Sequence, residues 1–239
     1  MAKQMIGEKP RRRRRTRAGT VLSEEMIVEA ALRMLHEHGR EGLSARRLGA
    51  ALGADPSTVY RYFRSMDDLT LAIGDALIAR ALQDWQTTGD WYADLRLLGL
   101  RIYHAYLAHP HAAVLTASRV SGRPHEIAAD EIVLSLLLSA GFSYETAARI
   151  YHVFIDQCLA FAALDAAFAA LPAQSRRADE AMWRTTYAHL PPKTHPGIAA
   201  TAGFLAARMA SSSYPDALDM LLDNAAHQLQ HQALAKTNE

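Results

Sequence analysis

Several features that would assign the chain to a common protein class are missing from its 239 residues. It has one cysteine, Cys158, which can form neither a disulfide within the chain nor, by itself, a zinc site. No Gly-rich phosphate loop, internal repeat or alternating β-pattern is present. The most apolar segment, residues 153–171, contains Asp156 and Asp165, which would be costly inside a bilayer. We therefore expect a soluble, cytoplasmic protein without a membrane partner.

Charge is scarce overall but unevenly distributed. The formal net charge is +1, and 21% of the residues are charged. Residues 1–66 hold 14 Lys and Arg against 7 Asp and Glu, whereas residues 67–239 hold 12 against 18. The arginine run at residues 11–15 is not followed by the apolar stretch of an export signal. The basic first quarter indicates that only this end of the chain meets a polyanion.

The spacing of apolar residues predicts helices from Ser23 onward, so the expected fold class is all-α. Ser23 is a candidate N-cap for a first helix that Gly39 ends. A second, shorter helix runs from Ser44 to Gly53, and Pro56 lies near the start of a third. Further helices are expected at residues 66–85, 91–108, 111–119, 124–140, 143–171, 180–190, 198–211 and 215–234, with a polar stretch at 173–179.

This pattern divides the chain into three parts. Residues 1–20 carry the arginines and almost no apolar periodicity, which predicts a disordered basic arm. Residues 21–66 form a compact three-helix domain, and residues 67–239 form a larger helical domain. The arm could follow DNA and enter its minor groove, or it could be a solvated tail that attracts polyanions without defined contacts.

Residues 43–63 have the pattern of a helix-turn-helix, in which two short helices flank a turn containing Gly53. The second helix begins with small hydroxyl residues and continues with Tyr60-Arg61-Tyr62. Hydroxyls allow close approach to phosphates and base edges, while arginine and tyrosine add charge, hydrogen bonds and stacking. A solvated helical hairpin is the structural alternative, but two tyrosines beside an arginine favour DNA binding. The candidate DNA-binding residues are Ser44, Arg46, Arg47, Ser57, Thr58, Tyr60, Arg61 and Tyr62.

This region resembles the DNA-binding domain of TetR-type transcriptional regulators over about residues 22–70. The resemblance is carried by Gly42-Leu43-Ser44, Leu48-Gly49, Leu52-Gly53, Ser57-Thr58-Val59-Tyr60-Arg61-Tyr62-Phe63 and Asp68-Leu69. It implies a homodimer that binds a palindromic operator and is released when a small molecule binds the C-terminal domain. The family's recognition-helix contacts map onto Ser57, Thr58, Tyr60, Arg61 and Tyr62, and those of the preceding helix onto Ser44, Ala45 and Arg46.

One position departs from this family pattern. The family usually has a lysine that contacts a DNA phosphate where this chain has Met66. Methionine cannot make that contact, and we expect Arg64 to replace it.

The C-terminal part contains two helices that suit a subunit interface. The segment 143–171 is apolar on nearly every face, so it must be covered on several sides. The segment 215–234 carries an amphipathic stripe. In the family that it resembles, two such helices per subunit form a four-helix dimer interface. Ordinary packing within one subunit is the alternative.

A ligand pocket is expected among the middle helices, because bundle cores are common ligand sites. Its candidate residues are aromatic side chains for the walls and polar side chains for orientation: Trp85, Tyr103, Tyr106, Phe154, Phe161, His104, His152 and Asp156. No cofactor or metal is expected. His227 and His231 lie four residues apart, but no carboxylate accompanies them at motif spacing.

Residues 109–168 also resemble the effector domain of the tetracycline-repressor branch, through Arg119 and Gly141-Phe142-Ser143. In that branch a histidine before the matching arginine binds drug-bound magnesium, and here Leu115 takes its place. Magnesium–tetracycline is therefore not the expected ligand.

The function we expect is that of a ligand-responsive transcriptional regulator, a repressor rather than an enzyme. Its partners would be double-stranded operator DNA, a small-molecule effector and a second copy of the chain. Two alternatives stay open: an architectural DNA-binding protein without effector, and a helical enzyme with an incidental helix-turn-helix-like hairpin.

Overall fold

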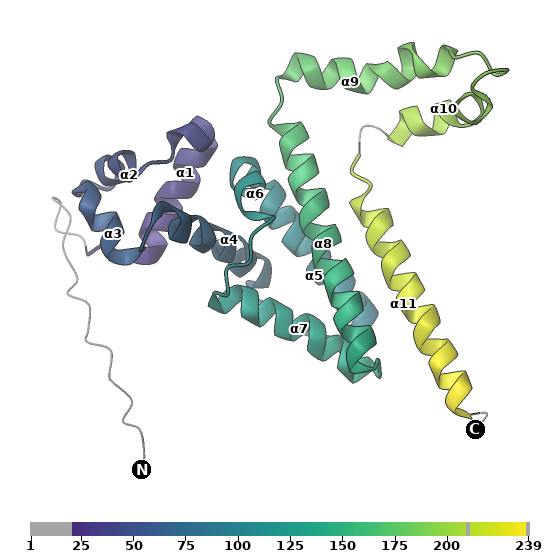
Figure 1. Ribbon diagram of the computed structural model, residues 1–239, viewed down its shortest axis with the longest axis horizontal. Helices are drawn as coiled ribbons and strands as arrows, with labels where there is room; N and C mark the ends of the chain where they lie inside the picture. Colours follow the sequence, from purple (N-terminus) through teal and green to yellow (C-terminus); the bar gives the residue numbers. More distant parts are fainter. Residues whose placement is uncertain (1–20, 209–210, 238–239) are drawn as a thin grey trace. The chain divides into compact units, whose positions relative to one another are not determined.

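The computed structural model describes residues 21–208 and 211–237, and every regular element in them is a helix (Figure 1). The all-α fold class is thereby confirmed. The described residues divide into two compact units, with the boundary between Leu69 and Thr70. The expected basic arm, residues 1–20, lies outside the described residues.

The smaller unit begins as the sequence pattern indicates. The hydroxyl of Ser23 accepts a hydrogen bond from the backbone N–H of Met26 at 3.3 Å and caps the first helix. Gly39, with φ of 62°, breaks the helical backbone, but helical structure continues to Gly42 instead of ending there. The elements of this unit are α1 (Glu24–Gly42), α2 (Ala45–Ala51), the 3-10 turn η1 (Pro56–Thr58) and α3 (Val59–Tyr62).

The larger unit contains the longest of the described helices. The sequence pattern predicted a polar stretch outside the helices at residues 173–179. This prediction is wrong, because these residues form the first half of a helix. Their Ala, Gln and Arg side chains have high helix propensity, which outweighs the missing apolar stripe. Helix α4 (Met66–Leu82) begins in the smaller unit and continues into the larger one. The elements that follow are α5 (Trp91–Leu107), α6 (Pro110–Thr116), α7 (Pro124–Ala140), α8 (Tyr144–Ala169), α9 (Ala173–Thr185), η2 (Tyr187–His189), α10 (Pro196–Arg208) and α11 (Tyr214–Thr237).

Helix α8 is the centre of this unit, and α5, α6, α7 and α11 all pack on it (Figure 1). Phe154 and Cys158 of α8 are fully buried against α5 and α11. Gly99 of α5 permits the close approach, since a Cβ atom there would lie 2.7 Å from the Tyr214 hydroxyl and 3.1 Å from the Phe154 ring. The thiol of Cys158 donates to the Gly99 carbonyl at 3.4 Å, so this cysteine is a packed core residue.

Polar contacts fix α11 against α5 and α8. Arg96 forms two hydrogen bonds to the Asp219 carboxylate, at 2.6 and 3.1 Å. The Tyr103 hydroxyl donates to Asp165 of α8 at 2.7 Å, and Ser212 donates to the same oxygen at 2.5 Å. These contacts explain how α8 can hold Asp165 between apolar residues.

By length and composition, α8 could also cross a membrane, with a mean hydropathy of 1.4 over its most apolar 18 residues. Four helices of the same unit pack on it, however, and Asp165 joins it to Tyr103 and Ser212. We interpret it as the central helix of a bundle. In the single chain, 22% of that window is buried.

The connection between α4 and α5 is organised around one carboxylate. Asp94 is 1% exposed and accepts hydrogen bonds from the Thr87 hydroxyl at 2.5 Å, the Thr88 N–H at 3.0 Å and the Gly89 N–H at 3.3 Å. Burial by itself raises the pKa of Asp94, but these hydrogen bonds outweigh burial, and the pKa lies below its usual value of 3.8. Helix α4 ends at Leu82 and not near residue 85, and Asp84 just after it has a non-helical backbone with φ of 53°.

We expect Asp94→Asn to lower the free energy of unfolding at pH 7 by about 1–3 kcal/mol, because the amide nitrogen cannot accept from these donors. A carboxylate whose pKa is lowered by folding stabilises above its unfolded pKa, and that stability is lost as pH falls through the folded pKa. The difference from wild type should therefore shrink as the pH is lowered toward 3. Urea unfolding at several pH values measures it, with Asp84→Asn as the control in the same loop. A difference that stays constant from pH 7 to 3 would contradict the assignment.

Candidate DNA-binding and effector sites

Two caps define the helix-turn-helix. The hydroxyl of Ser44 accepts from the Arg47 N–H at 3.3 Å and starts α2. The Asp55 carboxylate accepts from the Ser57 N–H at 2.8 Å and starts η1, with Pro56 at its first position. The recognition segment thus begins as a 3-10 turn and continues as the short helix α3.

The structure separates the predicted DNA-binding residues into surface and core. Arg46, Arg47, Ser57 and Arg61 are exposed, Tyr60 is 51% exposed and Ser44 is half-buried. Thr58, by contrast, is 5% exposed, beside the buried Val59 and Phe63. Tyr62 is half-buried, and its hydroxyl donates to the Leu22 carbonyl at 2.7 Å. Of the two tyrosines beside Arg61, only Tyr60 is therefore largely exposed, because Tyr62 ties α3 to the residues just before α1.

Arg64 is the residue expected to replace the family's lysine, and its side chain is almost wholly exposed. Its backbone N–H and its Nε both donate to the Asp68 carboxylate, at 2.9 and 3.4 Å. This carboxylate orients the guanidinium at the start of α4.

Gly49 sets the distance between α2 and the recognition segment. A Cβ atom at Gly49 would lie 2.9 Å from both the Ala54 carbonyl oxygen and the Pro56 nitrogen. At Gly53 the backbone has φ of 60° but no atom lies within 4 Å of an added Cβ. Gly49 is therefore needed for the close approach of two backbone segments, whereas Gly53 is needed for a left-handed turn.

We expect Gly49→Ala to displace the recognition segment and to weaken operator binding by about tenfold or more, with a loss of about 1–3 kcal/mol in stability. Gly53→Ala should cost about 1–2 kcal/mol of backbone strain yet leave operator affinity unchanged in the folded protein. Thermal unfolding together with operator titration separates the two effects. Equal operator affinity in both variants would contradict the role of Gly49.

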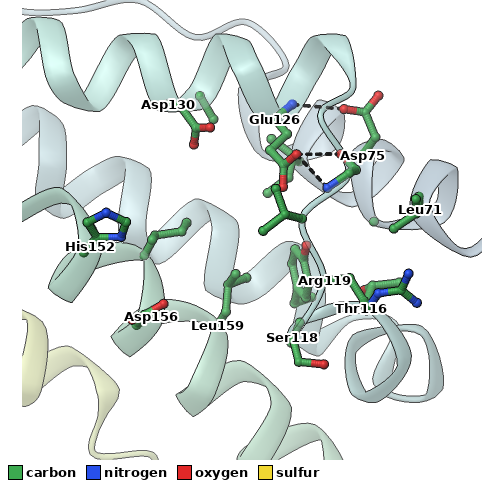
Figure 2. A pocket seen from close by; sticks show the side chains of 18 of the residues that line it. Leu71, Asp75, Thr116, Ser118, Arg119, Glu126, Asp130, His152, Asp156 and Leu159 are labelled. Carbon is green, nitrogen blue, oxygen red and sulfur yellow. Dashed lines mark hydrogen bonds between the residues drawn. The ribbon is translucent and has the colours of Figure 1, made fainter. Parts of the chain in front are cut away.

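In the larger unit, a cavity of about 240 Å³ lies among α4, α6, α7 and α8 (Figure 2). Its apolar lining includes Leu71, Ile78, Tyr106 and Leu159. Its polar lining includes Thr116, Ser118, Arg119, Ser121, Glu126, Asp130, Tyr151, His152 and Asp156. We call it the central cavity.

Asp75 closes one end of the central cavity and joins α4 to the start of α7. It is 8% exposed, and its carboxylate accepts from the backbone N–H of Glu126 at 2.9 Å (Figure 2). The same carboxylate accepts from the backbone N–H of His125, also at 2.9 Å. The His125 Nδ1 lies 2.8 Å from its other oxygen. Pro124 starts α7 without a side-chain cap of its own, so Asp75 supplies the acceptor from another helix.

The remaining carboxylates differ in their environment. Glu126 accepts from the Ser121 N–H and hydroxyl, both at 2.8 Å. Burial raises the pKa of Asp130, and a hydrogen bond from Tyr151 opposes that shift. Asp156 is exposed and lies one helical turn from His152 (Figure 2). The central cavity is therefore acidic where α7 faces α8.

Three of the eight predicted ligand-binding residues line this cavity: Tyr106, His152 and Asp156. Tyr103 and Phe154 are buried near Tyr214, Phe161 is half-buried beside it, and none of the three lines the central cavity. His104 is exposed, and Trp85 lines a different cavity. Within the described residues, no group of three His, Cys, Asp or Glu side chains is placed to hold a metal ion.

Two family models match the chain. The one described as "Bacterial regulatory proteins, tetR family" matches residues 27–73, and the one described as "Tetracyclin repressor-like, C-terminal domain" matches residues 85–226, which is more than half of the chain. The chain belongs to the TetR family. This is a family of transcriptional regulators, not of enzymes.

Individual TetR relatives are distant. A transcriptional regulator from Saccharopolyspora erythraea is 28% identical over 129 residues, which are 54% of this chain and 55% of the relative. Tetracycline repressor protein class A from transposon 1721 of Escherichia coli is 31% identical over 134 residues, 52% of this chain and 58% of the repressor. The chain thus matches these curated relatives over little more than half of their length.

The fold matches a solved TetR structure over most of both chains. Apo ActR from Streptomyces coelicolor superimposes with a TM-score of 0.77 at 20% identity, covering 88% of this chain and 98% of ActR. ActR in complex with actinorhodin gives 0.73 at 21% identity, covering 89% and 98%. At this identity the likeness establishes the TetR fold alone.

Several cavity residues of this TetR protein were missed from the sequence, among them Asp75, Glu126, Asp130 and Tyr151. Asp75 did leave a signal, since it lies between Ile73 and Leu77 in an apolar helix, where a carboxylate needs a partner. Its partner is a helix start about 50 residues away, which no local pattern reveals.

Proposed function

We propose that this TetR-family chain is a ligand-responsive transcriptional repressor that binds a palindromic operator as a homodimer in the cytoplasm. In this proposal a small molecule in the central cavity releases the DNA. The observation that carries it is the pairing, in one chain, of an exposed recognition segment with an acidic, partly apolar cavity.

The proposed DNA contacts come from both helices of the helix-turn-helix. Ser57, Tyr60 and Arg61 of the recognition segment would contact bases and phosphates, while Arg46 and Arg47 of α2 would contact the backbone. Thr58 and Tyr62 would support the segment from behind.

The proposed dimer interface uses the uncovered stripe of α8. Val153, Ala160, Leu164 and Ala167 follow one another at spacings of seven, four and three residues, and all four are exposed in the single chain. Val153 is 46% exposed and Leu164 is 65% exposed. A second copy packed on α8 and α11 would bury them.

The chemistry of the central cavity favours an effector with a positively charged end and an apolar body. Asp130 and Asp156 would attract an amine, and Tyr106 and Leu159 would contact the apolar part. Asp75 and Glu126 are already engaged at the start of α7, so they hold the cavity's shape. ActR, whose structure contains actinorhodin, is a family precedent for a bound small molecule.

The route from effector to DNA would run through α4. This helix carries Asp75 and begins at Met66, four residues after the end of the recognition segment at Tyr62. An effector that shifts α7 would act on Asp75 and hence on α4, so that operator and effector favour different positions of the DNA-binding units. An architectural protein without effector is disfavoured, because its interior would be filled where this chain has a cavity.

A footprint on the DNA upstream of the gene tests the proposal. We expect protection of two half-sites related by two-fold symmetry, with their centres about one helical turn or a multiple of it apart. Repeating the footprint with a panel of small amines should reveal compounds that remove the protection. If the protein protected every DNA sequence tested, with no two-fold symmetry in the protected region, the proposal would be contradicted.

A further inference from the structure

A second cavity, of about 590 Å³, lies in the larger unit and shares no lining residue with the central cavity. It adjoins the C-terminal half of α7, whereas the central cavity adjoins its N-terminal half. Its walls are the α4–α5 connection with the start of α5, and α7. The lining residues are Trp85, Thr87, Gly89, Trp91, Ile132, Ser135, Leu136, Ser139 and Ala140.

The two tryptophans of this cavity are each held by a neighbour. The Arg101 guanidinium carbon lies 5.9 Å from the centre of the Trp85 ring, in a cation–π contact. The Trp91 ring packs edge-to-face on Phe142, with ring centres 5.3 Å apart. Both indoles are therefore positioned before any ligand arrives, which reduces the entropy lost on binding.

The loop wall of the cavity is also fixed in advance. Thr87 and Gly89 line the cavity, and both donate hydrogen bonds to the buried Asp94 carboxylate. The third donor of this loop, Thr88, uses its N–H and its hydroxyl on the same carboxylate. A wall held by one buried anion keeps its shape without a ligand, as preformed small-molecule sites do.

The lining specifies the chemistry of the occupant. It contains no charged side chain, in contrast to the central cavity. Ile132 and Leu136 offer an apolar surface, and Thr87, Ser135 and Ser139 add hydroxyl oxygens to the lining. The hydroxyls of Thr87 and Ser135 already donate to Asp94 and Glu131, so toward a ligand their oxygens can only accept. Its volume falls within the range of about 300–1,000 Å³ that small-molecule sites occupy. Aromatic walls with scattered hydroxyls suit a flat ring system that carries few polar groups.

We propose that this second cavity binds an uncharged, planar aromatic small molecule, independently of the central cavity. The proposal does not rest on DNA binding, on the dimer or on the nature of the effector. Trp85 was predicted to bind a ligand but does not line the central cavity. In this proposal it binds a ligand in the second cavity.

The neutral dye N-phenyl-1-naphthylamine is a suitable probe, because its emission rises in apolar sites and its absorption overlaps tryptophan emission. The chain has three tryptophans, and Trp183→Phe leaves the two that line the cavity. In full-length Trp183→Phe protein we expect saturable dye binding with one site per chain. Tryptophan emission should fall as the dye binds, because both indoles would lie against it.

Three further substitutions, each made in the Trp183→Phe protein, locate the dye. Ser139→Phe places a ring inside the second cavity and should weaken dye binding at least tenfold. Leu138→Phe, at the exposed neighbouring position outside both linings, should change it less than twofold. Ser118→Phe in the central cavity should likewise change it less than twofold. Unchanged helical circular dichroism establishes that each variant is folded.

Three outcomes would overturn the proposal. One is the absence of saturable dye binding to the Trp183→Phe protein, as expected if a second copy of the chain covers the cavity. Another is equal dye affinity in the Ser139→Phe and Leu138→Phe variants. The last is loss of binding in Ser118→Phe alone, which would place the dye in the central cavity.

Discussion

Leu164→Glu is expected to convert the proposed dimer into a monomer and to lower operator affinity by about 100-fold or more. Leu164 is 65% exposed in the single chain and lies on the apolar stripe of α8. A second copy would bury this side chain, and a buried, unpaired carboxylate is costly. Operator affinity would fall because two linked DNA-binding units gain about 10²–10⁴ in avidity over one. Sedimentation velocity and operator titration of the same sample measure both effects.

Val114→Glu is the matched control for this variant. Val114 is 53% exposed on α6 and lies outside the stripe of α8, so the same change of charge should leave both mass and operator affinity unaltered. A Leu164→Glu protein that sediments as a dimer and binds the operator normally would contradict the interface. A monomeric protein with undiminished affinity would contradict the need for two DNA-binding units.

Arg61→Ala is expected to weaken operator binding by about 10–100-fold while the oligomeric state stays unchanged. Arg61 is exposed on α3 between the exposed Tyr60 and the half-buried Tyr62. An arginine that contacts a guanine edge contributes about 1–3 kcal/mol of discrimination, and the variant should therefore also bind base-substituted operators more evenly. Fluorescence anisotropy with the footprinted operator and a set of single-base variants measures both affinity and specificity.

Arg33→Ala removes the same charge from an exposed position on α1, outside the helix-turn-helix. Loss of a positive charge by itself would weaken binding equally in both variants, with no change in base preference. Arg33→Ala should instead stay within about twofold of wild type. Equal losses in the two variants would show that Arg61 acts only as a charge near the DNA.

The helix-turn-helix could be predicted from sequence because its determinants are local. Ser44 and Asp55 are caps that contact residues two or three positions away, and the Gly53 turn needs no distant partner. The role of Tyr62 could not be predicted in this way. Its hydroxyl donates to Leu22, 40 residues earlier, so the side chain that looked like a DNA contact holds the domain together.

The cavities depend on distant contacts, and the sequence pattern placed them less well. Tyr106, His152 and Asp156 were found because aromatic and polar residues in middle helices often line pockets. Phe154 is also an aromatic residue in a middle helix, but it faces Gly99 and Tyr214. One face of the central helix α8 is buried in the core, and a different face of the same helix lines the cavity. Trp85 and Tyr106 were predicted to line one pocket but line two different cavities. Predicting this would have required knowing that Asp94 fixes the loop that follows Trp85.

Effector release in a cavity-filled variant tests the central claim most directly. Labelled operator bound to wild type and to Ser118→Phe would be titrated with the amines that remove the footprint. Equal operator affinity for the two proteins is predicted, with release by the amine from wild type and at least tenfold less sensitivity in Ser118→Phe, whose added ring occupies the central cavity. Release from both proteins at the same amine concentration would contradict an effector site in that cavity.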